Sequence, residues 1–121
     1  MIYAFWGKVI KGKSRGKELG FRTANVRLTK VIAGGVYVSM CKVGGEMKRA
    51  VTFIGAAETF GETEVLAETY IFDFDKDIYG QWISVRLLKR IRKSKKFESK
   101  EKLIEAIERD VTEAREYFRV R

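Results

Sequence analysis

Along most of the chain, apolar and polar residues alternate at every second position, which is the pattern of β-strands with one buried face. In the most regular segment, Ile83, Val85 and Leu87 share one face, and the basic side is expected to point toward solvent or a ligand. In the first segment both faces carry apolar residues, so we expect both to be largely covered. The pattern predicts five or six short strands, within Tyr3–Ile10, Ala24–Leu28, Val36–Val43, Glu46–Ile54, Val65–Phe74 and Trp82–Ile91.

Near the C-terminus the spacing of apolar residues changes to three and four, which predicts an amphipathic helix over about residues 99–118. Ser99 is placed to cap its first turn. Strands followed by one helix predict an all-β fold with a C-terminal helix, either a small antiparallel barrel or a sandwich. The apolar stripe, which must pack on the strands, consists of Leu103, Ile107, Val111, Ala114 and Phe118.

The connections between the predicted strands contain glycine and acidic residues that are typical of turns and loops. Gly44 and Gly45 separate two strands and predict a tight hairpin. Residues 11–20, KGKSRGKELG, show no helical spacing and predict a long basic loop, a kind of loop that is usually functional. Residues 75–81 are expected to form a turn. Three alternating acids in this region lack the glycine and distal glutamate of a calcium loop, which favours a charged strand end: Asp73, Asp75 and Asp77.

The composition fits one globular domain, because 121 residues with 45% apolar content can form one core. We expect the barrel over about residues 1–97, the helix after it, and a monomer. No apolar run reaches the length of a membrane span, and the N-terminus is too soon interrupted for a signal peptide. One cysteine, Cys41, and no histidine argue against disulfides and structural zinc, and favour a cytoplasmic location with Cys41 as a small core residue. The initial Met is compatible with a complete chain.

The net charge is +9, and two segments carry most of the excess. Residues 8–30 contain eight Lys or Arg and one acid, and residues 86–96 contain seven Lys or Arg and no acid. Such segments favour a polyanionic partner, which could be nucleotide phosphates, nucleic acid or acidic lipid. A solvated surface that keeps the protein in solution is the alternative for either segment.

The stretch GKVIKGKS matches the phosphate-binding pattern G-x-x-x-x-G-K-[ST] at Gly7, Gly12, Lys13 and Ser14. That pattern binds nucleotide where a buried strand ends before the first glycine and a helix begins at the lysine. Here the predicted strand continues to Ile10, and the following RGKELG has two glycines and no helical stripe. We therefore predict that this stretch is not a P-loop.

Three segments, taken in order, resemble the riboflavin kinase family. GKVIKGKSRGKELGFRTAN resembles the family's glycine loop before L-G-F-P-T-A-N, and AETYIFDFDKDIYGQ resembles its glutamate-bearing strand and D-x-Y-G turn. IRKSKKFESKEKLIEAIERD resembles its Arg…Lys-Phe segment, then S-x-x-x-L and a helix with I-x-x-D. The resemblance implies a six-stranded antiparallel Greek-key barrel with a C-terminal helix. It also implies an enzyme that uses ATP and Mg²⁺ to phosphorylate the ribityl 5′-hydroxyl of riboflavin, giving FMN.

The same resemblance implies roles for individual residues. Thr23 and Asn25 would ligate Mg²⁺ and meet the ATP phosphates, with the hard oxygen atoms that this ion prefers. Glu68 would accept the proton of the attacking hydroxyl. The other implied contacts are to the nucleotide, from Gly12, Lys17 and Tyr79, and to the flavin, from Arg92, Lys95 and Phe97. Each position also has an ordinary interpretation, as a turn residue, a solvent-facing strand glutamate or a solvated basic face.

Four positions depart from the family pattern. Arg22 stands where the family has Pro before Thr-Ala-Asn, and it could instead touch phosphate. Phe53 and Glu58 replace the Asn and Pro of N-x-G-x-x-P-T-F, a segment that helps to build the substrate site. Lys17 replaces an Arg that is common among bacterial members, a milder change.

Two other functions stay open beside riboflavin kinase. The departures would suit a non-catalytic flavin- or nucleotide-binding module. The charge, with aromatic residues at Tyr3, Phe5 and Trp6, would suit a barrel that binds single-stranded nucleic acid. ATP and riboflavin are nevertheless the expected partners, nucleic acid is not favoured, and no membrane is expected. FAD synthesis is not predicted, because 121 residues leave no room for a second domain.

These interpretations make opposite predictions for two substitutions. Lys13→Ala should have a mild effect on FMN formation, because the lysine of the phosphate-binding pattern has no role in the riboflavin kinase interpretation. Asn25→Ala should have a severe effect, because it removes a metal ligand. Steady-state rates of FMN formation compare the two variants, and a severe loss in Lys13→Ala alone would restore the P-loop interpretation.

Overall fold

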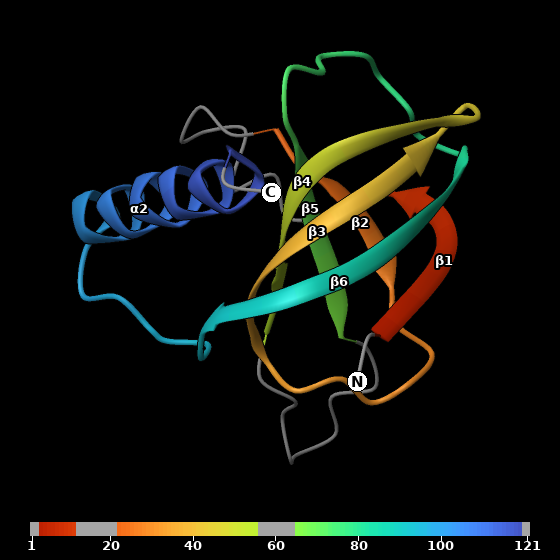
Figure 1. Ribbon diagram of the computed structural model, residues 1–121. Coiled ribbons are helices and arrows are strands. Elements are labelled where there is room, and N and C mark those ends of the chain that lie inside the picture. The colour runs from red at the N-terminus through yellow and green to blue at the C-terminus, as the bar shows by residue number, and fades with distance from the viewer. Residues whose placement is uncertain (1–2, 12–21, 56–64, 120–121) are drawn as a thin grey trace.

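Six antiparallel strands close into a barrel, and one helix packs against its outside (Figure 1). The computed structural model describes residues 3–11, 22–55 and 65–119. Among these residues, no helix has the length and apolar character needed to cross a membrane. The elements are β1 (Tyr3–Ile10), β2 (Ala24–Arg27), β3 (Gly35–Val43), β4 (Glu46–Ile54), β5 (Leu66–Ile71), β6 (Trp82–Arg92) and α2 (Lys100–Arg119).

The strands follow one another around the barrel in the order β1-β2-β5-β4-β3-β6, and β6 closes on β1. Strands β3, β4 and β5 form a meander, and β6 returns beside β3, which is a Greek-key arrangement. The predicted six-stranded antiparallel barrel with a C-terminal helix is therefore confirmed. Gly44 and Gly45 form the predicted hairpin turn with φ of 55° and 85°, a conformation that glycine adopts without steric cost.

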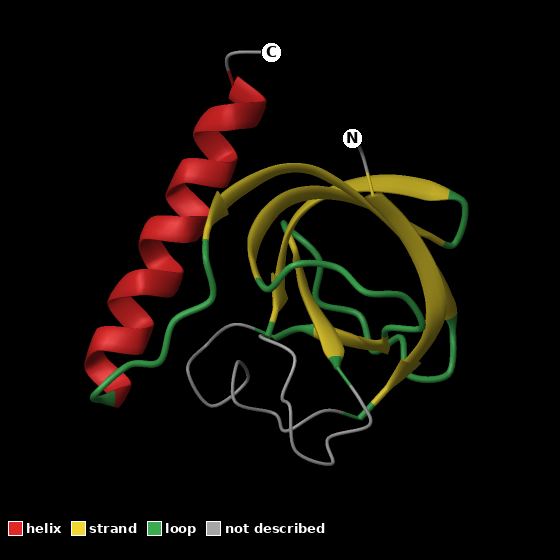
Figure 2. Ribbon diagram, turned by 90° about the horizontal axis from the view of Figure 1, so that it is seen from below, coloured by secondary structure: helices red, strands yellow, loops and turns green. Residues whose placement is uncertain are grey.

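The apolar residues form two layers, one inside the barrel and one between the barrel and α2 (Figure 2). The inner layer includes Phe5, Val26 and Cys41. Burial raises the pKa of the Cys41 thiol to about 12, so the thiol stays neutral and acts as a core side chain. The outer layer joins α2 to the outward side chains of β3 and β4, among them Val38 and Val51. One side of the barrel is thus covered by the helix.

Three buried hydroxyl groups form a chain across the barrel interior. Ser39 Oγ lies 2.9 Å from Thr52 Oγ1, which lies 2.9 Å from Thr69 Oγ1. Each of the three residues is at most 1% exposed, so the hydroxyls satisfy one another where water cannot reach them. Thr69, the last residue of this chain of hydroxyl groups, also lines the pocket at one end of the barrel.

The C-terminal helix follows the predicted pattern closely. The Lys102 amide donates to Ser99 Oγ at 3.2 Å, which confirms Ser99 as the cap of the first turn. Ala114 and Phe118 of the predicted stripe are buried in the outer apolar layer. The helix contacts β3, β4 and β6, the strands that its apolar face covers.

One expectation about burial is wrong. We expected both faces of the first strand to be covered, but the outward face of β1 is largely open, with Trp6 72% exposed. The inward side chains, such as Phe5 and Val9, fill the barrel as alternation requires. The helix that could have covered the outward face packs on the opposite strands instead, because their outward residues are apolar too.

Gly7 is a strand residue that lets β1 and β2 approach closely. A Cβ atom at Gly7 would lie 2.5 Å from Val26 Cγ1, which is far inside van der Waals contact. Strand β1 continues through Gly7 to Ile10, so the strand does not end before the glycine as a P-loop requires. The prediction that residues 7–10 are barrel strand is confirmed, and the last three residues of the pattern lie outside the described residues.

Gly7→Ala should destabilise the barrel by about 1–3 kcal/mol, because the new methyl group overpacks the contact with Val26. Urea unfolding monitored by circular dichroism measures this change. Gly55→Ala is the matched control, because a Cβ at Gly55 meets nothing within 4 Å. Equal free energies of unfolding for the two variants would contradict the proposed close approach of β1 and β2.

Candidate active site

Strands β2 and β5 bring Asn25 and Glu68 side by side. The two residues are directly opposite in the antiparallel ladder, and Asn25 is also opposite Ile10 of β1. Directly opposed side chains point to the same face with Cβ atoms about 4.5–5.5 Å apart. The predicted metal ligand and the predicted proton acceptor, 43 positions apart in the sequence, therefore lie together on the outside of the barrel.

The side chain of Asn25 has an unsatisfied oxygen atom. Asn25 is 4% exposed, and its Oδ1 has no hydrogen-bond partner among the residues that the structure describes. A buried polar atom without a partner costs about 1–3 kcal/mol, and within the described part of the chain Oδ1 is available as a ligand atom. An amide oxygen is a hard ligand that suits Mg²⁺. The donor set therefore fits the implied ion on the protein side.

The described residues supply few metal ligands besides Asn25. No group of three or more Cys, Asp or Glu side chains that could enclose an ion occurs in residues 3–11, 22–55 and 65–119. Mg²⁺ commonly takes only one or two protein ligands and completes its shell with substrate phosphates and water. A site with two protein ligands, Asn25 and Thr23, agrees with this preference of Mg²⁺.

A pocket opens at the end of the barrel beside Thr23. It encloses about 410 Å³, a volume that includes its open mouth. The Arg22 guanidinium lines it and donates from Nη1 to the Asp75 carbonyl oxygen at 3.0 Å. The position that departs from the family's Pro is thus tied to the facing loop by this hydrogen bond. The lining residues are Val9, Arg22, Thr23, Ala24, Thr69, Ile71, Phe74, Lys76, Asp77, Ile78 and Tyr79.

The turn that carries Tyr79 is fixed to the end of β1. The Tyr79 amide donates to Asp77 Oδ1 at 3.1 Å, and the Gly80 amide donates to the Val9 carbonyl at 2.9 Å. Gly80 has a φ of 81°, which a residue with a side chain rarely adopts. These contacts hold Tyr79, which is 52% exposed, at the rim of the pocket that Thr23 also lines.

A single row of paired residues leads from Asn25 around the outside of the barrel. Glu68 is opposite Phe53 on β4, Phe53 is opposite Val36 on β3, and Val36 is opposite Arg92 on β6. Adjacent strands lie about 4.8 Å apart, so Arg92 is roughly 14 Å from Glu68 along this row. Phe53 and Val36 form an apolar stretch between the carboxylate and the guanidinium.

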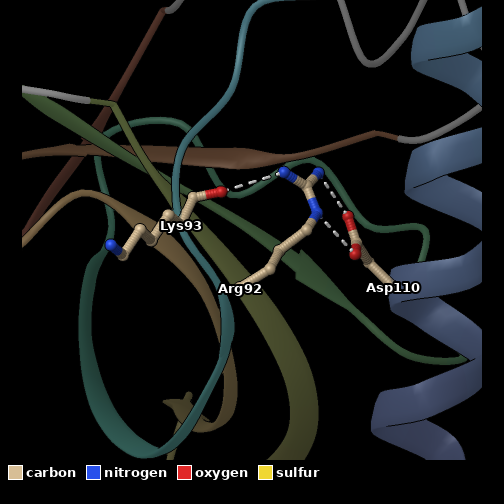
Figure 3. A network of polar contacts seen from close by, with 3 residues as sticks. All are labelled: Arg92, Lys93 and Asp110. Carbon is tan, nitrogen blue, oxygen red and sulfur yellow. Dashed lines mark hydrogen bonds and ion pairs between the residues drawn. The ribbon is translucent and has the colours of Figure 1, made fainter.

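Arg92 is held by the helix (Figure 3). Its Nε and Nη2 donate to the two carboxylate oxygens of Asp110 at 2.9 and 2.7 Å, and its Nη1 donates to the Lys93 carbonyl. Asp110 is 3% exposed, and this bidentate pair satisfies both of its oxygens. The guanidinium also lies 5.4 Å from the centre of the Phe97 ring, and the Lys95 ammonium lies 5.6 Å from it.

The predicted site residues fall into two described groups. The first comprises Asn25, Glu68, Thr23 and Tyr79 around β2, β5 and the pocket; the second comprises the Arg92, Lys95 and Phe97 cluster at the end of β6. Their proposed roles stay predictions. Five residues that the sequence analysis names individually lie outside the described residues: Gly12, Lys13, Ser14, Lys17 and Glu58.

Asp110 has a structural role that the sequence analysis did not assign. Its position three residues after Ile107 and four before Ala114 places an acid within the apolar stripe of the helix. A buried carboxylate needs a cationic partner. The spacing of Asp110 within the apolar stripe could therefore have indicated a buried ion pair. Only the tertiary structure shows that the partner is Arg92.

A closed barrel with a buried amide oxygen beside a carboxylate, next to a basic pocket, has the groups that a phosphotransferase needs. Comparison with known proteins gives the family. Residues 1–118 match the flavokinase family, described as riboflavin kinase, and the chain belongs to this family.

Relatives and solved structures agree with this assignment. The chain is 40% identical over 122 residues to the bifunctional riboflavin kinase/FMN adenylyltransferase of Bacillus subtilis, covering 96% of this chain and 39% of that protein. It is 38% identical over 109 residues to the RNA-binding riboflavin kinase RibR of the same species, covering 88% of this chain and 47% of that protein. The crystal structure of riboflavin kinase from Trypanosoma brucei superposes with a TM-score of 0.67 at 25% identity, covering 98% and 80% of the two chains. The chain thus spans less than half the length of these two curated relatives.

Asp110→Asn should lower the free energy of unfolding by about 1–3 kcal/mol, because it leaves the Arg92 guanidinium without a charged partner at a half-buried position. Glu116→Gln is the matched control on the same helix, because the exposed pair Arg119–Glu116 should contribute about 0.5 kcal/mol or less. Urea unfolding compares the two. Equal and small effects would show that the Arg92–Asp110 pair does not anchor the helix.

Proposed function

We propose that this chain transfers the γ-phosphoryl group of ATP to the ribityl 5′-hydroxyl of riboflavin, giving FMN and ADP. The observation that carries the proposal is the pairing of Asn25 with Glu68, in a chain of the riboflavin kinase family. An unsatisfied amide oxygen and a carboxylate on adjacent strands are the two protein groups that this reaction needs most.

Thr23 and Asn25 would hold Mg²⁺ through a hydroxyl and an amide oxygen. With the ATP phosphates, the ion would neutralise charge on the transferred group and on the leaving ADP. Both residues are placed by β2, Asn25 within the strand and Thr23 directly before it. A strand held on both sides positions ligands more precisely than a free loop does.

Glu68 would accept the proton of the ribityl hydroxyl. As the hydroxyl oxygen bonds to the γ-phosphorus, the bond to the bridging oxygen of ATP breaks, and the hydroxyl proton passes to the Glu68 carboxylate. A single well-placed carboxylate is sufficient because phosphoryl transfer depends mainly on positioning and charge neutralisation. The chain contains no histidine, which is consistent with this division of work.

The nucleotide would occupy the pocket beside Thr23. Arg22 and Lys76 bring positive charge to its wall, and Tyr79 offers a ring at its rim. Gly12 and Lys17 would complete the phosphate contacts from the basic loop. Arg22 would thereby supply a cation at the position where the family has Pro.

The flavin would lie along the row from Glu68 to Arg92. Phe53, which is partly buried beside Glu68, provides an apolar surface for a flat ring system, and Phe97 with its two cations, Arg92 and Lys95, forms the far end. This placement gives Phe53 a direct role in substrate binding, although the family has Asn at that position. A ribityl chain extending from the ring would end near Glu68.

The wider setting follows from the same proposal. We propose that the chain works as a monomer in the cytoplasm on these small-molecule substrates. FMN adenylylation, which the bifunctional relative also performs by its name, is not proposed for these 121 residues. The RNA binding in the name of RibR is not carried over either, since the chain covers 47% of that protein.

Incubation with riboflavin, Mg²⁺ and ATP should produce FMN, detected by chromatography. Glu68→Gln should lower kcat by about 100- to 10,000-fold, because it removes the proton acceptor but keeps the shape of the side chain. Glu105→Gln, on the exposed side of α2, is the matched control and should leave the rate unchanged.

Three outcomes would count against the proposal. Riboflavin binding without FMN formation by the unaltered chain would favour a non-catalytic flavin-binding module. An undiminished rate in Glu68→Gln would remove Glu68 from the mechanism. A rate that persists after chelation of divalent ions would contradict the role given to Thr23 and Asn25.

A further inference from the structure

Both tryptophans of the chain are exposed on one outer face of the barrel. Trp6 is 72% exposed and Trp82 is 62% exposed, although buried apolar partners are available elsewhere in a protein of this size. Exposed aromatic residues that lie close together usually mark an interaction surface. We call this surface the tryptophan face and define it by the outward residues Trp6, Lys8, Lys42, Met47, Trp82, Ser84 and Arg86.

The strand register shows that these residues form a continuous ladder. One row crosses four strands, from Trp6 on β1 through Ser84 and Lys42 to Met47 on β4. In the neighbouring row, Lys8 is directly opposite Trp82. Trp6 and Trp82 are therefore diagonal neighbours on the same side of the β1–β6 ladder, with Cβ atoms about 7–8 Å apart. Lys8 is directly opposite Trp82 and two positions along β1 from Trp6, so one cation is next to both tryptophan positions.

The charge on this face has one sign. The outward positions of the described β1, β3, β4 and β6 residues around the tryptophans include the cations of Lys8, Lys42 and Arg86 and no acid. Glu46, the nearest acid on β4, lies in the other set of alternating positions and pairs with Lys48 at 3.3 Å. An anionic partner would therefore meet only positive charge, and no negative charge, on the tryptophan face.

The face continues into a basic groove beside the helix. Met47, the last residue of the row from Trp6, lines this groove together with Arg49, Arg115 and Arg119. One acid, Asp73, also lines the groove, with its Oδ1 3.9 Å from Arg115 Nη2. In the groove, the Arg115 guanidinium lies 4.3 Å from the centre of the Phe72 ring. In Figure 1, β3 and β6 cross the front of the barrel between β1 on the right and α2 on the left.

We propose that the tryptophan face binds single-stranded nucleic acid. Trp6 and Trp82 stack on two bases, and Lys8, Lys42 and Arg86 contact the phosphates that link them. Aromatic platforms interleaved with cations on a β-sheet are the combination that such a ligand requires, since every base has a flat face and every linkage carries a charge. The basic groove extends the path for the backbone.

The geometry favours this ligand over two others. A membrane surface is best met by aromatic residues at a protruding tip, whereas Trp6 lies in the middle of a strand with Ser84 and Lys42 in its row. A stable protein partner favours a contiguous apolar centre with charges at the rim. On the tryptophan face, the cations of Lys8, Lys42 and Arg86 are instead close neighbours of the two tryptophans in the strand register. The membrane surface is one of the contrary outcomes of the experiment.

The tryptophan face is separate from the proposed phosphotransfer site. Asn25 and Glu68 lie on β2 and β5, while the tryptophan face belongs to β1, β3, β4 and β6. The inference therefore does not rest on the proposed function. It takes up the nucleic-acid alternative of the sequence analysis, which was not the favoured one. It relies on Trp6 but not on Phe5, which the structure places inside the barrel.

Tryptophan fluorescence tests this proposal directly, because Trp6 and Trp82 are the only tryptophans in the sequence and both lie on the tryptophan face. Titration of the protein with a 12-nucleotide oligo-U RNA, and separately with a 12-nucleotide oligo-dT, should quench its intrinsic fluorescence as bases stack on the rings. Comparison of the two oligonucleotides shows whether the ribose or the deoxyribose strand is preferred. Binding of either oligonucleotide without quenching would place the contact elsewhere and overturn the proposal.

Variants separate this face from non-specific attraction by the net charge. With fluorescein-labelled oligonucleotide, Trp6→Ala and Trp82→Ala should each weaken binding about 5- to 150-fold, the effect of losing one stacked base. Val31→Ala, at a residue that is 93% exposed and outside the tryptophan face, is the control and should bind as the unaltered chain does. Lys42→Gln should reduce the slope of log K against log salt by about 0.7.

Two results would replace the proposal. Equal affinities for the tryptophan variants and Val31→Ala would show attraction by charge alone. Quenching by anionic phosphatidylglycerol vesicles but not by oligonucleotides would identify a membrane surface instead. Thermal unfolding and FMN formation, both expected to be unchanged in Trp6→Ala and Trp82→Ala, show that any loss of binding is local.

Discussion

The register of β2 between β1 and β5 is the constraint on which the proposed site depends. Asn25 meets Glu68 because this four-residue strand is held in one alignment on both sides. A shift by one residue would turn Asn25 into the core and bring Ala24 or Val26 outward, since side chains alternate. The alignment is supported by the inward burial of Val26 and by the absence of a side chain at Gly7, which lets β1 approach.

The helix covers one side of the barrel and leaves the other side exposed to solvent. The outward faces of β3 and β4 are apolar and need cover, so α2 packs there and is tied to β6 by the Arg92–Asp110 pair. This contact brings Arg92 and Phe97 to the row that ends at Glu68. On the other side, β1 and the first residues of β6 lie away from the helix, and Trp6 and Trp82 remain in solvent. One fold thus presents a covered side and an open side.

Sequence patterns predicted the elements well because each strand has one buried face and the helix has one apolar stripe. They failed where burial depends on a distant segment. Trp6 was expected to be covered because apolar residues occupy both faces of its strand, but no part of the described chain packs on it. Asp110 was given no role of its own, because its partner lies 18 positions away at the end of β6.

The sequence by itself determined the strand and helix positions, the hairpin at Gly44-Gly45 and, through three ordered motifs, the family and its candidate residues. Local periodicity and short motifs are enough for these, because they depend on near neighbours in the chain. Only the tertiary structure decided which strands pair, and so which residues meet. Strand pairing is long-range, and Asn25 and Glu68 become neighbours only when the barrel closes around its core. The burial of the Asn25 side chain and the exposure of Trp6 and Trp82 are consequences of that closure.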